Sequence, residues 1–305
     1  MTLSIAHASA TSLGATLQCG VNPTGNVRLD HDLVCPHSFV VGASSASAPI
    51  KIDLGGYTLT VTRPDAPCRF SQPVATCAVF GLGPVTLLDG SIKGSVGLAS
   101  VRAPSRIRGV NIDGDLWMSG VGGRFVASSI SDGSVRAYSS TVTIDHNVIH
   151  HGGISLNDTD TRMAIEIKHN VIAGSPGVAI AGVFGGGGEF QNDVAGVIQG
   201  NVVTNSTGAG IGLSGALTNI GALAIVRNRI FHSGADGIHI EGLAVPPTPY
   251  LGGPVTLTQN RVGGSAGYAV NAPWVTNLPG TAIVDGGGNV GWASGASPCI
   301  GVVCH

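Results

Sequence analysis

Val142-Thr-Ile-Asp-His-Asn147-Val-Ile149 recurs almost unchanged as Ile165-Glu-Ile-Lys-His-Asn170-Val-Ile172. In both stretches apolar residues alternate with polar or variable ones, and an Asn follows the alternation. The same pattern returns in residues 197–203, 223–230 and 255–262. The aligned residues are Asn147, Asn170, Asn201, Asn228, Asn260 and Asn289, at steps of 23, 31, 27, 32 and 29 residues. One unit is therefore repeated, with insertions of variable length.

A second short strand is predicted after each of the first five Asn residues. These strands are residues 153–156, 177–180, 210–213, 237–240 and 267–270, and each begins with Gly. A serine precedes four of them, at Ser175, Ser206, Ser233 and Ser265. Such short strands cannot bury an apolar face alone. Stacked about 4.8 Å apart, however, each can pair in parallel with its equivalents above and below.

These features predict an all-β fold, a single right-handed parallel β-helix of about ten coils with loop insertions. A β-propeller would need four longer strands in each unit. We expect the Asn amides to hydrogen-bond from coil to coil at a turn, where Asn also tolerates a left-handed backbone. Weaker repeats at 50–59, 85–92 and 107–112 extend the pattern upstream without a break in composition. The prediction is one domain over residues 1–305, with a cap and first coil (1–49), coils (50–294) and a disulfide-closed tail (295–305).

The composition excludes several classes of protein. The chain has 305 residues, 48 of them Gly, with 43% hydrophobic residues, 10% charged residues and a net charge of −2. This balance excludes a disordered chain, and the glycines lack the three-residue period of collagen. No apolar run approaches the roughly 18 residues of a membrane span. The absence of a basic excess argues against nucleic acid as a partner, so neither membrane nor nucleic acid is expected to bind.

The six cysteines form three close pairs in the sequence: Cys19 with Cys35, Cys68 with Cys77, and Cys299 with Cys304. Their spacing is not that of a zinc ribbon or a thioredoxin-type site. Local disulfides in an exported protein are the favoured interpretation, and six buried thiols are the alternative. The expected localisation is therefore extracellular or periplasmic. Residues 1–7 lack the pattern of a signal peptide, so we expect that one has been removed.

Two sets of residues resemble a known superfamily. Asp32-Leu-Val-Cys35 and Ile52-Asp-Leu-Gly-Gly-Tyr-Thr-Leu59 resemble the first coils of exported bacterial β-helix proteins, and the Asn-centred repeats resemble those of the pectin-lyase-like superfamily. The resemblance implies a polysaccharide lyase, a glycoside hydrolase, a uronan epimerase or a non-catalytic adhesin or maturation factor. The Asp-Pro-His-Glu signature of alginate epimerases is absent, as is the Asp-Asp pair with Gly-His-Gly expected of polygalacturonases. The fold alone therefore does not identify the functional site, and individual outward-facing residues have to indicate it.

Two outward faces carry polar residues. On the strand before the Asn, Asp145, Glu166 and Lys168 are expected side by side, with His146 and His169 stacked in the next column. A solvated face with cross-strand ion pairs is the simplest interpretation of that group.

On the strand after the Asn, small residues predict a trough. Its expected floor is Ala179, Ala181, Gly212 and Ser214, with polar residues at both ends. The two largest insertions, 183–193 and 243–253, follow this strand and would form walls around an extended polymer. This trough is the preferred site.

The candidate residues come mainly from the trough. The catalytic candidates are His239, Glu241, Asp158, Asp160 and Lys168. The candidates for substrate binding are Asn157, Arg162, Ser214, Glu189 and Asn271, with Asp193 also on a wall. His239 is expected to act as general base or acid, because imidazole titrates near neutral pH, and Glu241 is expected to be its partner. Asp158 and Asp160 would bind the sugar or a metal ion. His232 and Asp236 are expected to cap the strand by local hydrogen bonds.

Three chemistries compete for this trough. Lyase-type β-elimination on an extended polysaccharide or oligosaccharide is favoured; it needs a base near the sugar C5 and a cation near the uronate carboxylate. A glycoside hydrolase would need two carboxylates about 5–9.5 Å apart. A non-catalytic binder is the third alternative, although aromatic residues are only 5% and Trp117, Trp274 and Trp292 lie far apart in sequence. No obligatory cofactor is predicted, and Ca²⁺ is the cofactor that the acidic pair would suit.

Overall fold

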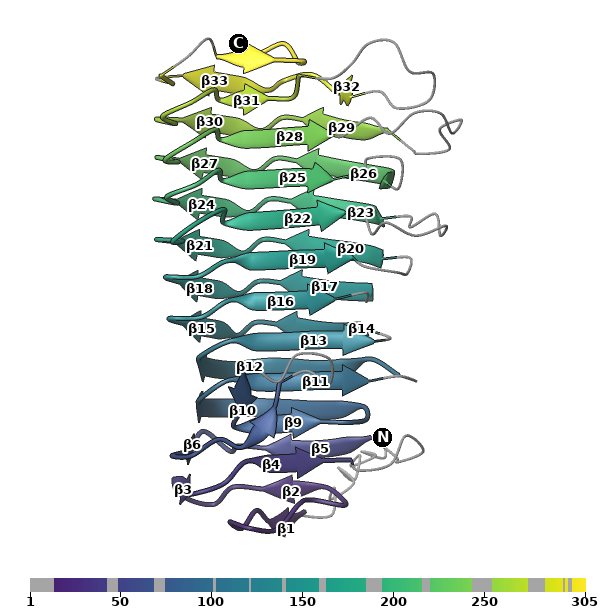
Figure 1. Cartoon of the computed structure of the whole chain (residues 1–305), viewed down its shortest axis with the longest axis vertical. Coiled ribbons are helices and arrows are strands. Elements are labelled where there is room, and N and C mark those ends of the chain that lie inside the picture. The colour runs from purple at the N-terminus through teal and green to yellow at the C-terminus, as the bar shows by residue number, and fades with distance from the viewer. Residues whose placement is uncertain are drawn as a thin grey trace, which may run out of the picture.

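The computed structural model describes thirteen stretches of the chain. They are residues 14–42, 49–68, 75–100, 103–120, 122–138, 141–158, 163–184, 194–215, 220–242, 254–273, 283–292, 294–295 and 298–305. Every regular element in these stretches is a β-strand, and the strands stack as successive coils along one long axis (Figure 1). The described residues contain no helix of the length and apolar character that crossing a membrane would require.

The strands form two large sheets and one small hairpin. The 21-stranded sheet contains β1 (Ala15–Thr16), β2 (Val27–Arg28), β3 (Leu33–Cys35), β5 (Ile50–Asp53), β6 (Thr58–Val61), β10 (Val85–Lys93), β12 (Ser105–Asp113), β14 (Gly122–Val126), β15 (Ser129–Ser131), β17 (Thr141–Asp145), β18 (Val148–His150), β20 (Met163–Lys168), β21 (Val171–Ala173), β23 (Val194–Gln199), β24 (Val202–Thr204), β26 (Ile220–Val226), β27 (Arg229–Phe231), β29 (Val255–Thr258), β30 (Arg261–Gly263), β32 (Ile283–Asp285) and β33 (Val290–Trp292). The 11-stranded sheet contains β4 (Phe39–Val41), β9 (Val79–Gly81), β11 (Val96–Ser100), β13 (Leu116–Gly120), β16 (Val135–Tyr138), β19 (Ile154–Asp158), β22 (Ile180–Phe184), β25 (Ile211–Gly215), β28 (Ile238–Gly242), β31 (Val270–Asn271) and β34 (Cys299–Ile300). The hairpin is β7 (Ala66–Pro67) with β8 (Thr76–Cys77).

Parallel pairing between consecutive coils confirms the predicted solenoid. β17 pairs with β20, β20 with β23, and β23 with β26, always in parallel. Only β7 and β8 pair antiparallel among the described strands. One strand from each coil enters the 11-stranded sheet, close to the expected ten coils. The chain is therefore an all-β parallel β-helix.

Alternation along each strand explains the core. In β20, Met163, Ile165 and Ile167 are buried, while Ala164 and Glu166 between them are exposed. Since successive side chains of a strand point to opposite faces, one set fills the solenoid and the other faces outward. Stacked coils repeat this arrangement, and one apolar core extends along the solenoid.

A ladder of buried Asn side chains joins the coils. Each Nδ2 donates to the Oδ1 of the next Asn, as between Asn170 and Asn201 at 2.9 Å and between Asn201 and Asn228 at 2.9 Å. Each Nδ2 also donates to a carbonyl of the preceding coil, as from Asn201 to Ile167 at 3.0 Å. The predicted ladder is therefore confirmed. The hydrogen bonds of its amides offset the cost of removing these polar groups from water.

The left-handed turn lies one residue earlier than expected. His146, His169, Arg227 and Gln259, each just before a ladder Asn, have φ angles of 53–55°. Equivalent positions hold Gly200 and Gly288. The ladder Asn residues are not among the positive-φ positions, so the expectation that Asn itself is left-handed is wrong. Asn contributes its side-chain amide to the ladder, and the residue before it adopts the left-handed backbone conformation.

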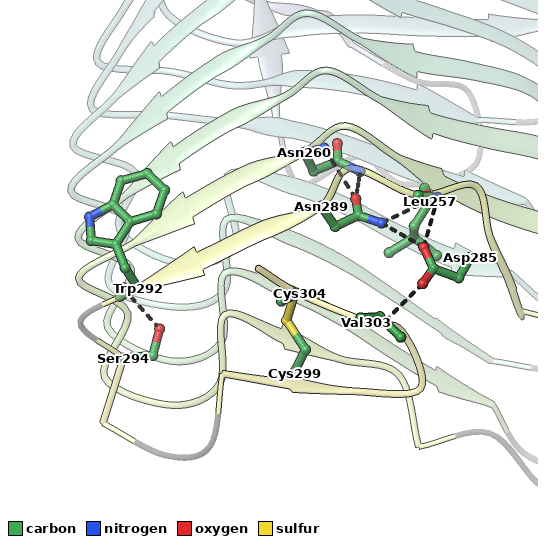
Figure 2. Close-up of a disulfide and its surroundings, with 10 residues drawn as sticks. Leu257, Asn260, Asp285, Asn289, Trp292, Ser294, Cys299, Val303 and Cys304 are labelled. Atoms are coloured by element: carbon green, nitrogen blue, oxygen red, sulfur yellow. Dashed lines mark hydrogen bonds between the residues drawn. A yellow bond between two sulfur atoms is a disulfide. The ribbon is translucent and has the colours of Figure 1, made fainter.

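The three predicted disulfides are present. Cys19 bonds to Cys35, Cys68 to Cys77 and Cys299 to Cys304. The last one closes the C-terminal tail (Figure 2). Beside it, Asn289 ends the ladder: its Nδ2 donates to Leu257 O and to Asp285 Oδ1, each at 3.0 Å. Asp285 also accepts a hydrogen bond from the Val303 amide at 2.9 Å, which fastens the tail to the last coil.

Candidate functional site

Strand register defines the outer face of the 11-stranded sheet, where the trough was predicted. Pairing from β13 to β31 places one outward residue of each coil in a single column. In chain order this column is Trp117, Arg136, Ser155, Ala181, Gly212, His239 and Asn271. A second column runs beside it through Ser119, Tyr138, Asn157, Val183, Ser214 and Glu241. In the first column, Trp117 and Arg136 therefore lie at one end and His239 and Asn271 at the other, with Ser155, Ala181 and Gly212 between them.

The structure corrects the expected floor of this trough. Ala179 and Ala269 are fully buried and belong to the core. Ser155 pairs with Ala181, and Asn157 pairs with Val183, which is 50% exposed. The sequence alignment predicts Ala179 beside Gly212 and Ala181 beside Ser214, whereas the structure pairs Ala181 with Gly212 and Val183 with Ser214, a shift of two residues. Such a shift leaves the in–out alternation unchanged, so the alternation cannot reveal it. For the same reason Asn271 lies beside His239, whereas the sequence alignment predicts it beside Glu241.

An Asp–His pair dominates the C-terminal end of this face. His239 Nδ1 lies 2.7 Å from Asp236 Oδ2. The same oxygen accepts from Asn271 Nδ2 at 2.8 Å, and Asp236 Oδ1 accepts from the Tyr268 amide at 2.7 Å. Asp236 is nearly buried, with 12% of its side chain exposed. A carboxylate held by three donors fixes the ring orientation of its histidine.

The other ring nitrogen of His239 faces Glu241. Nε2 lies 3.6 Å from Glu241 Oε2, and the Glu241 side chain is 66% exposed. A histidine with one nitrogen held by a buried carboxylate and the other directed outward can accept or donate a proton. The expected partner of His239 was Glu241, but Asp236 is the residue that orients the ring. The local cap expected of Asp236 is not what the structure shows, because its carboxylate accepts from the Tyr268 amide and Asn271 of the next coil and binds His239.

The sequence-based prediction missed an aromatic group at the opposite end of the face. The rings of Trp117 and Tyr138 are stacked, with centroids 5.7 Å apart and planes inclined by 6°. The Arg136 guanidinium lies over Trp117 at 5.0 Å from the ring centroid, and its Nε is 3.5 Å from Asp115 Oδ2. Trp117 Nε1 is buried without a hydrogen-bond partner among the described residues. Trp117 lies far from the other Trp residues in sequence, but strand register brings it beside Tyr138.

The disulfide hairpin bounds this aromatic end. Ala66, Phe80 and Ala99 form a small apolar cluster on the outside of the 11-stranded sheet. A Cβ on Gly97 would lie 2.7 Å from the carbonyl oxygen of Cys68, so the hairpin backbone sits directly on that strand. The open part of the face therefore begins at Trp117.

An open hollow lies at the middle of the face. Its volume is about 230 Å³, and it borders the start of β19 and the turn before β22. The lining residues are Ser134, Gly153, Ile154, Ser155, Ser175, Pro176, Gly177 and Val178. The hollow exists because side chains along this stretch are small. Val178 leans toward the next coil, where a Cβ on Gly212 would lie 2.9 Å from Val178 Cγ1.

Several candidate residues do not join this group. Lys168 lies in β20, in the 21-stranded sheet, and its Nζ is 3.2 Å from Glu166 Oε1. Lys168 therefore lies on a different sheet from His239, and its catalytic role stays a prediction. The backbone of Asp158 pairs with Phe184 at the end of β19. Asp160, Arg162, Glu189 and Asp193 lie outside the described residues, as do most residues of the two predicted walls. The suggested calcium site at Asp158 and Asp160 stays a prediction.

Comparison with known proteins identifies the family. A family model described as a right-handed beta helix region matches residues 109–277, more than half of the chain. Neither a search of curated proteins nor a search of solved structures gives a match.

Proposed function

The chain belongs to the right-handed β-helix family, and on that premise we propose that it binds an extended carbohydrate and transforms it along the outer face of the 11-stranded sheet. Trp117 and His239 are five coils apart in one column. At about 4.8 Å per coil they are separated by roughly 24 Å. A ligand that contacts both ends must therefore be long and extended, as a polysaccharide is.

The two ends suit different parts of such a ligand. Sugar rings have apolar C–H faces, and a stacked Trp117–Tyr138 pair offers a flat surface against which such a face can pack. Arg136 adds a guanidinium that can bind a carboxylate of an acidic sugar. A chain lying over the intervening coils would meet the small side chains of Ser155 and Ala181 and, at the Gly212 coil, Val178, whose Cγ1 lies 2.9 Å from where a Gly212 Cβ would be.

The Asp236–His239 pair is the observation that supports catalysis most strongly. In β-elimination a base removes the proton from the carbon next to the uronate carboxylate. The bond to the leaving sugar oxygen then breaks, that oxygen takes up a proton from water to become a hydroxyl, and a carbon–carbon double bond forms. His239 Nε2 would accept that proton, while Asp236 and the nearby Glu241 would stabilise the resulting imidazolium.

A glycoside hydrolase with a carboxylate pair is the alternative. Asp236 is poorly suited to that chemistry because its two oxygens already accept three hydrogen bonds. Glu241 then remains as the available carboxylate beside His239 in the described part of the chain. Hydrolysis needs two such groups, and the described residues beside His239 offer one. A non-catalytic carbohydrate-binding protein would need the aromatic end and not the Asp–His pair.

A screen of polysaccharides distinguishes these activities. Wild-type protein is incubated with uronic-acid-rich and neutral polymers, and both ultraviolet absorbance and new reducing ends are recorded. A lyase produces both signals, because elimination leaves an unsaturated uronate and cleaves the chain. Reducing ends without absorbance would instead establish a hydrolase. Binding to a polymer with neither signal would establish a non-catalytic binder and contradict the proposed catalysis.

We also propose that the protein works in an oxidising compartment, extracellular or periplasmic. The three disulfides support this assignment, because such bonds persist mainly outside the cytosol. Peptide mapping without reductant, performed on protein from its native host, should recover all three bonds. Free thiols at these positions would contradict the assignment.

A further inference from the structure

We propose that Asp145, His146 and His169 form a binding site for a divalent transition-metal ion such as Zn²⁺. The three residues lie at the ends of β17 and β20 in the 21-stranded sheet, whereas the proposed carbohydrate site lies on the 11-stranded sheet. Asp145 Oδ1 lies 2.8 Å from His146 Nδ1 and 3.2 Å from His169 Nδ1. One ligand atom from each residue lies within 4.8 Å of the others. Two imidazoles thus converge on one carboxylate from two adjacent coils.

These separations are close to those that a metal ion requires. Zinc binds imidazole nitrogen and carboxylate oxygen at about 2.0–2.2 Å, so neighbouring ligand atoms of a tetrahedral site lie roughly 3.3–3.5 Å apart. The N···O separations of 2.8 Å and 3.2 Å are about 0.5 Å and 0.1 Å below the lower end of that range. Small side-chain rotations would bring the ligands into place. Imidazole and carboxylate together suit Zn²⁺, Ni²⁺ or Cu²⁺, whereas Ca²⁺ and Mg²⁺ prefer oxygen ligands alone.

The backbone holds the ligands in a fixed arrangement. His146 and His169 have left-handed φ angles of 55° and 53°, and each precedes a buried Asn of the ladder. Stacking of the two coils brings their rings to a centroid separation of 4.7 Å. In the next coil the equivalent residue is Gly200, where a Cβ would lie 2.9 Å from His169 Cδ2. Gly200 therefore leaves room for the His169 ring to lie against it.

The charges around the cluster are compatible with a cation. Lys168 is the neighbour of Asp145 across the strands, and its ammonium group is paired with Glu166 at 3.2 Å. Gln199, which follows Lys168 in the same column, is neutral. Side-chain exposure of 63% for His146 and 45% for His169 leaves the remaining coordination positions open to water. Three protein ligands and a water molecule are a common zinc arrangement.

The chain offers a matched control for this cluster. His151 also has a left-handed backbone, with φ of 52°, and its Nδ1 lies 2.9 Å from Asp132 Oδ1. That carboxylate is bound by one imidazole, and the neighbouring His150 ring lies 6.5 Å from the His151 ring, centroid to centroid. Asn is a suitable replacement at these positions, because Asn205 occupies the left-handed position equivalent to His151 two coils later, with φ of 55°. His146→Asn, His169→Asn and His151→Asn should therefore all fold.

Titration calorimetry with ZnCl₂ tests the proposal on the tag-free full chain. Wild type and His151→Asn should each bind one Zn²⁺ with affinities within about 2-fold of each other. His146→Asn and His169→Asn should bind more than about 10-fold more weakly, since even loss of an outer-shell partner costs 10–100-fold. With Cu²⁺ bound in place of Zn²⁺, the electron paramagnetic resonance spectrum should show hyperfine coupling to two imidazole nitrogens in wild type and to one in either variant. Absence of Zn²⁺ binding in wild type, or equal affinity in His169→Asn and wild type, would overturn the proposal.

Discussion

At the scale of single residues, Asp236 belongs to no recognisable sequence motif, yet its carboxylate makes three hydrogen bonds in the proposed site. In sequence it is one polar residue in a turn, so strand capping was its expected role. The fold brings Tyr268 and Asn271 of the next coil onto the same carboxylate that holds His239. No pattern within one repeat could show this convergence, because it arises between coils.

Asp236→Asn tests the orientation of His239. The amide oxygen can still accept the hydrogen bond from Tyr268, but an amide cannot stabilise the imidazolium as a carboxylate does. We expect kcat on the polysaccharide identified by screening to fall about 10²-fold or more, with KM nearly unchanged. Asp132→Asn, which alters another His–Asp pair on an exposed turn, is the control and should retain full activity. Equal rates in the two variants would mean that Asp236 has no part in catalysis.

At the scale of the repeated elements, sequence and structure agree best. The alternation of apolar residues predicted the strands, and the Asn spacing predicted the ladder, because both depend on interactions repeated in every coil. The outward columns of the 11-stranded sheet were predicted less well, since a two-residue shift leaves the alternation unchanged. For the same reason, the neighbours of Trp117 were visible only once strand register was known.

Asn201→Ala should destabilise the solenoid. Asn201 accepts from Asn170 and donates both to Asn228 and to the Ile167 carbonyl, all buried. Each orphaned polar group costs about 1–3 kcal/mol, so we expect a loss of about 3 kcal/mol or more in the free energy of unfolding. Urea denaturation measures it, with the outward-facing Gln199→Ala as control. A loss as small as that of the control would show that the ladder contributes little to stability.

Trp117→Ala should weaken binding of the polysaccharide without changing the chemical step. Trp117 is five coils from His239, so its contact with a sugar ring would stabilise substrate and transition state alike. We expect KM to rise about 10-fold at nearly constant kcat, and to rise less for short oligosaccharides that do not reach both ends. Initial rates over a range of substrate lengths provide the measurement. An unchanged KM for long substrates would remove Trp117 from the binding surface.

At the scale of the whole molecule, the two ends of the solenoid need closure, because an exposed strand edge can pair with another chain. At the C-terminal end, hydrogen bonds from the Val303 and Gly287 amides lower the pKa of Asp285 below its ordinary value of 3.8, against the opposing effect of burial. A carboxyl group whose pKa is lowered by folding stabilises the fold above its unfolded-state pKa. That contribution is lost as the pH falls through the folded-state pKa.

The C-terminal tail should therefore loosen in acid. We expect the hydrogen-exchange protection factor of the Val303 amide to be constant above about pH 4 and to decrease at lower pH, since the unfolded-state pKa of Asp is about 3.9. Asp285→Asn should lower protection at neutral pH and abolish the acid transition. An acid transition of the same size in this variant would assign the effect to another group.

The most direct test of the proposed function compares His239→Ala with Lys168→Ala on the polysaccharide identified by screening. The two residues lie on different sheets of the solenoid. If the outer face of the 11-stranded sheet is catalytic, His239→Ala should reduce the initial rate by about 10²–10⁴-fold, the usual effect of losing an acid–base group. Lys168→Ala should stay within about 2-fold of wild type. Full activity in His239→Ala together with its loss in Lys168→Ala would place the active site on the 21-stranded sheet and contradict the account.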